Sequence, residues 1–410
     1  MTTAQPKKVS KRLIITLSSI YAISPFAIDS YLPAIPLIAN EMQVHISLLS
    51  VTVSLYILGL AIGQLIGGPL SDKHGRLPIM LLGLFIFALA SLLLTTSSHI
   101  ALLWGWRLMQ AIGGGIAIVG VPATIRDNAD GKEAAKLFAL VALIMMIAPS
   151  IAPTIGNLIL SLHSWHWIFY FTAGFSCIAM LMAKKYVPHQ SKKQKKLLAI
   201  TIERKKGIKF IEVFKHKQGI GYMLAQAFAF AVMMTFVANS AMIYLSIFKV
   251  TATTFTQLFA LNIGGLIFIN RLNTLLLNRF EPAMLARCFL TMQFLGGVLL
   301  FASSLIAPDN LTLIVIGFMI MISANGGVMA NCNACFLKYF GKNAGTASAV
   351  LGAFQCTIGA TISAFAAFIS MGYLQPVVFI MLISSSIALT AVIHSNKQAS
   401  LAEALEVETP

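Results

Sequence analysis

Charged side chains are scarce in this chain, and acidic ones are scarcer than basic ones. Only 10% of the 410 residues are charged, with 13 Asp and Glu against 29 Lys and Arg. A typical soluble domain carries about 25% charged residues. So few charges cannot cover a water-soluble surface of this size. Together with the 58% of hydrophobic residues, this scarcity predicts a membrane protein.

Several signatures of soluble chemistry are missing as well. No GxxxxGK[ST] loop occurs, so ATP-driven transport within this chain is unsupported, and no cofactor is expected. No nucleophile–base constellation in a soluble context occurs, so we do not predict an enzyme. Cys332 and Cys335 have C-x-x-C spacing, but they lie in an apolar segment without a second pair. We interpret them as small apolar residues and predict no metal site.

Long apolar segments fill the chain instead. A hydrocarbon core of ~30 Å requires roughly twenty apolar residues per helix. Twelve segments qualify, at 13–35, 48–70, 77–97, 101–124, 134–160, 166–183, 219–247, 255–278, 283–306, 310–337, 343–370 and 373–394. We therefore predict an all-α membrane protein with twelve transmembrane helices.

The basic residues predict the orientation of these helices. If the N-terminus is cytoplasmic, 26 of the 29 Lys and Arg lie in inner segments, and only Lys249 lies in an outer loop. This is a strong positive-inside signal, and it places both termini in the cytoplasm. The net charge of +16 is spread over these loops, so we predict no nucleic-acid partner.

The longest hydrophilic stretch, 184–218, divides the helices six and six. We expect an N-terminal six-helix bundle at 1–183, a basic linker at 184–218, a C-terminal bundle at 219–396 and a cytoplasmic tail at 397–410. The linker fits an amphipathic helix on anionic lipid or a solvated tether about equally well.

A faint repeat aligns Tyr31-Leu32 in DSYLPAIP with Tyr244-Leu245 in AMIYLSIF.

Two charges inside the first bundle raise a functional question. The segment AISPFAIDSYLPAIP (22–36) contains one acid, Asp29, and the fourth segment contains Arg107. Charges at this depth are costly and usually act in transport. At 1.5 Å per residue, both lie ~8–10 Å from the outer helix ends, which allows a pair, directly or through water. Asp29 then either exchanges a proton or forms a permanent ion pair that ties two helices.

The second bundle contains a third intramembrane charge, Arg271. It either faces an inner cavity and attracts an anionic or zwitterionic substrate, or it snorkels toward the cytoplasm. Asn239 and Asn262 are further candidates for lining a cavity, although such amides more often form hydrogen bonds between helices.

Six motifs, in order and at matching positions, make the chain resemble the major facilitator superfamily. The second loop, GGPLSDKHGRLP (67–78), is similar to the family motif G-x-L-x-D-R-x-G-R-R/K, except for Leu77. LLWGWRLMQAIGGG (102–115) and APSIAPTIGNLI (148–159) resemble the fourth-span motif and the fifth-span antiporter motif. FTQLFALNIGGLIF (255–268), NAGTASAVLGAFQCTIGA (343–360) and D-x-Y-L-P-A-x-P at 29–36 resemble the bicyclomycin/chloramphenicol-resistance (Bcr/CflA) subfamily of drug:proton antiporters.

The resemblance implies two six-helix bundles with the major facilitator fold, alternating access, and a monomer in the bacterial inner membrane. It implies that the chain exports small amphipathic drugs in exchange for protons. The residues that the resemblance implies for proton coupling and substrate binding are Asp29, Arg107, Tyr31 and Gln110. Its predicted gating helix contains Pro149, Pro153 and Gly156. Export of a self-made metabolite, such as a siderophore or an amino acid derivative, and a receptor or scaffold without transport are the alternatives.

The resemblance also implies a conformational latch at the inner face. Asp72 would meet the N-terminus of the eleventh helix near Gly345, where free N–H groups and the helix dipole favour an anion. Arg76 would pair with Asp127 at the end of the fourth helix. The alternative for Asp72 is that it caps its own turn.

Overall fold

The computed structural model describes residues 10–129, 131–188, 213–214, 216–340 and 344–408. Within these residues the regular structure is helical, without a strand. Eleven helical segments of this part of the chain are long and apolar enough to cross a membrane, and one further helix contains a shorter apolar stretch, Ile147–Leu162. Each predicted segment corresponds to one of them, so the prediction of an all-α membrane protein is confirmed.

The helices belong to two compact units, which are described separately. The first contains residues 1–44 and 55–206, and the second contains 45–54 and 207–410. The chain passes between them within the predicted linker 184–218, most of which lies outside the described residues. An amphipathic helix in that linker therefore stays a prediction.

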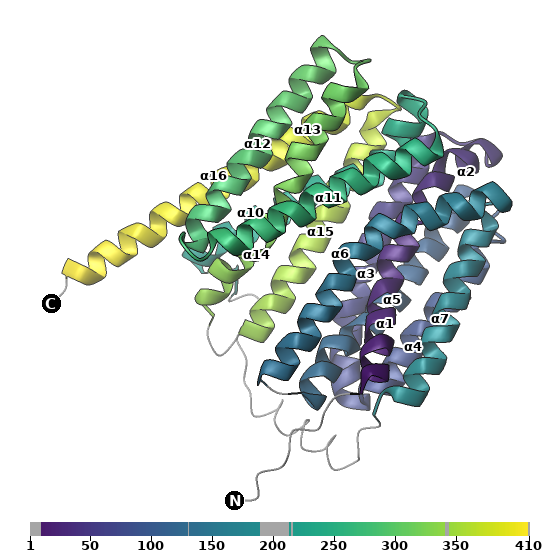
Figure 1. The fold of residues 1–410 in the computed structure, drawn as a ribbon, viewed down its shortest axis with the longest axis horizontal. Helices are drawn as coiled ribbons and strands as arrows, with labels where there is room; N and C mark the ends of the chain where they lie inside the picture. The colour runs from purple at the N-terminus through teal and green to yellow at the C-terminus, as the bar shows by residue number, and fades with distance from the viewer. Residues whose placement is uncertain (1–9, 130, 189–212, 215, 341–343, 409–410) are drawn as a thin grey trace, which may run out of the picture. The chain divides into compact units, whose positions relative to one another are not determined.

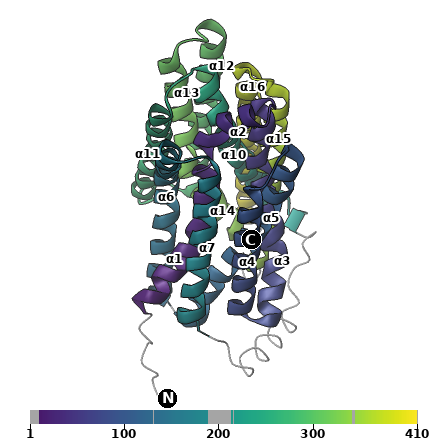
Figure 2. The ribbon, with the colours of Figure 1, turned by 90° about the vertical axis from the view of Figure 1, so that its right-hand side faces the viewer.

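The first unit is built around its N-terminal helix. Figures 1 and 2 show α1 between α6 and α7, and α4 packs against α5 and α7. Its core consists of apolar side chains such as Leu84, Phe87 and Val121. The elements are α1 (Lys11–Asp29), η1 (Leu32–Ala34), α2 (Ile35–Glu41), most of α3 (Ile46–His74), α4 (Arg76–Leu94), α5 (Ile100–Asn128), α6 (Gly131–Leu162) and α7 (His166–Tyr186).

The first span is longer and less regular than the sequence predicts. α1 ends at Asp29, a short 3-10 turn follows at Leu32–Ala34, and α2 continues to Glu41. Pro33 and Pro36 lie at this junction, where their missing N–H groups and fixed φ interrupt a regular α-helix. Asp29 therefore lies about 18 Å along the axis from Glu41. The helical segment therefore does not end at residue 35, where we expected it to end, and the depth of Asp29 in the membrane stays a prediction.

The second unit is arranged around α10, which packs against α14, α15 and α16. Residues 242–247 form a π-helix, and the tenth span is divided at Ala324. α16 continues beyond residue 396, where we expected the tail to begin. The elements are α10 (Lys217–Ala241), η2 (Met242–Ile247), α11 (Ala252–Leu276), α12 (Pro282–Ile306), α13 (Leu311–Ser323), α14 (Asn325–Lys338), α15 (Ala344–Ser370) and α16 (Leu374–Glu408).

Candidate functional site

Arg107 is fully buried in α5 and binds the end of α1. Its Nη1 and Nη2 atoms donate to the carbonyl oxygen of Ala27 at 3.2 and 3.3 Å. Ala27 lies in the last turn of α1, where the helix dipole places partial negative charge. A buried cation needs such partners, because its desolvation is otherwise very costly. The guanidinium thus joins α5 to the point where the first span becomes irregular.

Aromatic rings surround the same guanidinium. The Arg107 Cζ atom lies 4.4 Å from the ring centre of Tyr31, 5.1 Å from that of Tyr56 and 5.8 Å from that of Phe169. These distances are within the range of cation–π attraction. The rings come from the residue before η1, from α3 and from α7, so one arginine contacts several elements of the first unit. We call Arg107, Tyr31, Tyr56, Phe169 and Gln110 the arginine cage.

Gln110 orients the cage from within α5. Its Oε1 accepts from Arg107 Nη1 at 2.8 Å, and its Nε2 donates to the Ser91 hydroxyl on α4, also at 2.8 Å. Ser91 in turn donates to the carbonyl of Phe87. Arg107 Nε is buried without a hydrogen-bond partner among the described residues. The Nε–H group is therefore available to another ligand.

Asp29 lies beside this cage but is not tied to it by an ion pair. Its side chain is 5% exposed. Asp29 and Arg107 are both described residues, and no ion pair joins them, so the permanent pair considered from the sequence is absent. Arg107 contacts the Ala27 carbonyl instead, two residues before the acid. Tyr31 of the cage follows Asp29 by two residues, directly after the end of α1.

The predicted gating helix packs directly against the residue that follows Asp29. α6 continues through Pro149 and Pro153 without ending. A Cβ on Gly156 would lie 2.0 Å from the carbonyl oxygen of Ser30, so only glycine allows this approach. The structure therefore brings α6 against the α1–η1 junction.

Two of the predicted cavity residues of the second unit are buried asparagines, and the third is an exposed arginine. Asn239 and Asn262 are fully buried, and each Nδ2 donates to a carbonyl of its own helix at 2.9 Å. Their Oδ1 atoms have no hydrogen-bond partner among the described residues. Arg271 is exposed on α11. A role for these residues toward substrate remains a prediction.

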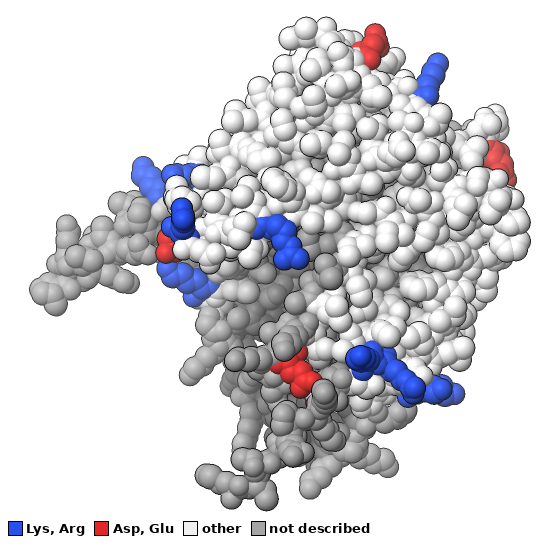
Figure 3. Space-filling view, in the orientation of Figure 1, with Lys and Arg blue, Asp and Glu red and all other residues white. Residues whose placement is uncertain are grey.

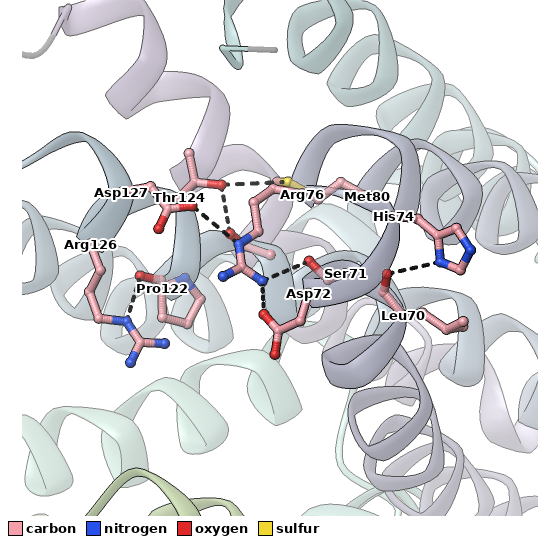
Figure 4. Close-up of polar contacts among 11 residues, drawn as sticks. Leu70, Ser71, Asp72, His74, Arg76, Met80, Pro122, Thr124, Arg126 and Asp127 are labelled. Atoms are coloured by element: carbon pink, nitrogen blue, oxygen red, sulfur yellow. Dashed lines mark hydrogen bonds and ion pairs between the residues drawn. The ribbon is translucent and has the colours of Figure 1, made fainter. Parts of the chain in front are cut away.

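Arg76 begins α4, directly after the α3–α4 turn at Gly75, and it forms the expected ion pair with Asp127 near the end of α5. Arg76 Nε donates to Asp127 Oδ2 at 3.2 Å, and Arg76 Nη1 contacts both Asp72 and the Ser71 hydroxyl (Figure 4). We call Asp72, Arg76 and Asp127 the loop cluster. Asp72 is 38% exposed there. Gly345 lies in the first turn of α15, in the other unit, so its contact with Asp72 stays a prediction.

Sequence reasoning missed two of the five residues of the arginine cage. Tyr56 and Phe169 lie in apolar segments, where an aromatic residue carries no distinguishing signal. The same holds for the Ala27 carbonyl, which is a backbone group. Their contribution depends on how helices distant in the sequence pack together.

Comparison with known proteins gives one consistent result. Residues 17–364 match the family described as Major Facilitator Superfamily. The "Bicyclomycin resistance protein homolog" of Haemophilus influenzae is 30% identical over 369 residues, which are 90% of this chain and 92% of that protein. The "Multidrug resistance protein MdtL" of Salmonella paratyphi B is 25% identical over 399 residues, 97% of this chain and 98% of that protein. The crystal structure of a D-xylose-proton symporter aligns with TM-score 0.70 at 13% identity, covering 94% of this chain and 97% of that one.

Proposed function

Because the chain belongs to the Major Facilitator Superfamily, we propose that it exports amphipathic antibacterial compounds in exchange for protons. It is a transporter and not an enzyme, and it is a multi-pass protein of the bacterial inner membrane. The direction of transport, the coupling ion and the cargo are the parts that we propose.

The observation that supports proton coupling is the environment of the Asp29 side chain. It is an almost fully buried acid within a membrane span, and its side chain is not in an ion pair with Arg107. An acid locked in an ion pair would hold its negative charge throughout the cycle. Asp29 is not held in such an ion pair, so it can take up a proton from one side of the membrane and release it to the other.

The arginine cage gives this proton exchange a structural consequence. Protonation of Asp29 removes a negative charge near the Arg107 guanidinium, which is bound to the Ala27 carbonyl. The α1–η1 junction then experiences a different local field. Because Gly156 contacts Ser30 at that junction, α6 is positioned to respond to the charge of Asp29. Proton release and substrate binding would in this way favour opposite arrangements of the same helices.

The proposed cargo rests on the relatives and on the chain's apolar interior. Two relatives bear names that refer to bicyclomycin and multidrug resistance. In the second unit, buried aromatic rings cluster around Tyr244, with Phe236, Phe255 and Phe318 at centroid distances of 6.3, 6.2 and 6.2 Å. Such rings suit apolar parts of a ligand, whereas a few polar groups fix its orientation.

Whole-cell efflux tests this function. The chain is expressed in bacteria that lack their main drug exporters, and the accumulation of a panel of amphipathic antibacterial compounds is measured with and without a protonophore. We expect lower accumulation than in vector controls, and we expect the protonophore to abolish the difference while ATP is maintained.

Equal accumulation in expressing and control cells, with the protein verified in the membrane, would contradict drug export. Parallel measurement of excreted metabolites distinguishes an exporter of a self-made compound from a receptor or scaffold. Efflux that persists under the protonophore would contradict proton coupling alone.

A further inference from the structure

A cavity of about 790 Å³ lies in the second unit. It lies at the helix ends that the distribution of basic residues predicts to be cytoplasmic. Residues from α10, α12, α14 and α16 line it, near the start of α12 and the end of α14. Figure 3 shows basic side chains gathered beside an acidic one over the ends of α10, α12 and α16. The volume is typical of ligand pockets, which span ~300–1,000 Å³.

The charge at the cavity mouth is basic. Arg287 on α12 and Lys338 on α14 are both exposed and both line the cavity. One acid, Glu281 before α12, also lines it. Two cations from different helices against one acid leave an excess of positive charge, so an anionic ligand is favoured.

The inner wall of the cavity is held in place by hydrogen bonds between helices. Tyr222 on α10 is 2% exposed, and its hydroxyl donates to Asn396 Oδ1 on α16 at 2.6 Å. Asn396 Nδ2 donates to the Ala283 carbonyl on α12 at 3.0 Å. These bonds join α10, α12 and α16 at the cavity, so the site is preformed.

The outer side of the cavity continues into an apolar surface. Met284 lines the cavity and is 44% exposed, and Leu295 and Leu299 on α12 are 58% and 39% exposed. At about 100° per residue these three side chains lie on one face of the helix. Ala334 of α14 also lines the cavity and is small and exposed. A cavity with basic residues at its mouth therefore lies at the end of an apolar strip.

We propose that this cavity binds the phosphodiester headgroup of an anionic phospholipid, with an acyl chain lying along the exposed face of α12. A free phosphate would use only the basic end, whereas a phospholipid uses both the basic end and the apolar strip. Basic pockets between membrane helices on the cytoplasmic side suit such headgroups. The bound lipid would stabilise the ends of α12, α14 and α16. This inference is independent of what the chain transports.

Native mass spectrometry of the full chain in detergent tests the site, with dioleoyl-phosphatidylglycerol as the probe and dioleoyl-phosphatidylcholine for comparison. We expect one phosphatidylglycerol to be retained preferentially. In the double variant Arg287→Gln/Lys338→Gln its affinity should fall about thirtyfold, because each basic residue contributes about fivefold. The matched control is Lys184→Gln/Arg279→Gln, which removes the same charge from exposed residues that do not line the cavity.

A second variant keeps the test valid if the loss of charge disturbs folding. Ala334→Phe narrows the cavity without changing any charge, and it should weaken phosphatidylglycerol binding while the protein stays monodisperse. Equal losses in the control pair and the cavity pair would overturn the proposal. Undiminished binding in both cavity variants would do so as well. Displacement of the lipid by millimolar inorganic phosphate would overturn the lipid assignment in favour of a free anion.

Discussion

Arg107 is buried among partners that suit a guanidinium better than an ammonium. One carbonyl accepts from both terminal nitrogens, Gln110 accepts from one of them, and the Tyr31 ring lies 4.4 Å from Cζ. A planar fork can make these contacts at the same time. The burial of this charge is thus compensated without an ion pair to Asp29.

Arg107→Lys should therefore impair transport although the charge is conserved. A lysine loses at least one charged hydrogen bond and the stacked contact, together worth ~2 kcal/mol or more, so we expect at least about a tenfold fall in transport rate. Efflux rates normalised to the amount of protein in the membrane measure this effect. Arg279→Lys, at an exposed loop position, is the control and should transport normally. Wild-type rates in Arg107→Lys would show that the cage only joins helices.

Some features at this scale follow from the sequence, and others do not. Asp29 and Arg107 stand out because charges are rare in apolar segments. Tyr56, Phe169 and the Ala27 carbonyl do not stand out, because aromatic side chains and backbone carbonyls occur in every span. The ion pair considered between Asp29 and Arg107 is absent because the guanidinium binds the end of α1, and helix ends cannot be located from composition alone.

At the scale of the helices, the first and seventh spans depart from regular geometry at the aligned positions of the faint repeat. Tyr31-Leu32 leads into the 3-10 turn η1, and Tyr244-Leu245 lies in the π-helix η2. Short π-helical stretches are rare and often occur at functional sites. The twelve spans were predictable because the hydrocarbon core imposes length and apolarity on each segment. The irregular turns were not, since they depend on local packing.

Gly156→Ala should separate α6 from the α1–η1 junction. The new methyl group would lie 2.0 Å from the Ser30 carbonyl oxygen, a backbone atom that cannot rotate away. Overpacking of this kind costs ~1–3 kcal/mol, so we expect lower thermal stability and slower transport. Melting of the purified protein and efflux rates measure both effects.

Gly174→Ala is the matched control for this substitution. It lies in α7, and a Cβ there meets nothing within 4 Å. We expect it to leave transport unchanged and to alter stability by at most ~1 kcal/mol, in the favourable direction. Equal effects of the two substitutions would show that the approach of α6 to Ser30 does not matter.

The loop cluster gives a second prediction at this scale. Asp72 contacts Arg76 but remains 38% exposed, so it is accessible to a partner outside this cluster. If it also binds the N-terminus of α15 during the cycle, Asp72→Asn should lower turnover and leave substrate affinity nearly unchanged. Distances between spin labels on the inner ends of α3 and α15 should shift toward the inward-open state. Asp309→Asn, an exposed acid in another loop, is the control, and unchanged distances in Asp72→Asn would exclude the latch.

The orientation of the whole molecule rests on the distribution of its basic residues. We predict that a cysteine placed at Lys193 reacts with a membrane-impermeant reagent only from the cytoplasm, and that one at Asp309 reacts only from outside. Lys193 lies in the linker, outside the described residues. Native Cys177 and Cys288 are exposed and should first be replaced by serine. Labelling from the opposite side at either position would reverse the orientation and the proposed direction of transport.

Proton-coupled export is the central claim for the whole molecule, and an imposed pH gradient tests it most directly. Purified protein is reconstituted into liposomes, and accumulation of a substrate identified by whole-cell efflux is followed after a pH jump. We predict uphill accumulation by wild type and by Asp309→Asn. Asp29→Asn should lose uphill accumulation but retain downhill exchange, because the amide keeps the size of the side chain and cannot carry the proton. Full pH-driven accumulation by Asp29→Asn would contradict the assignment of proton coupling to Asp29.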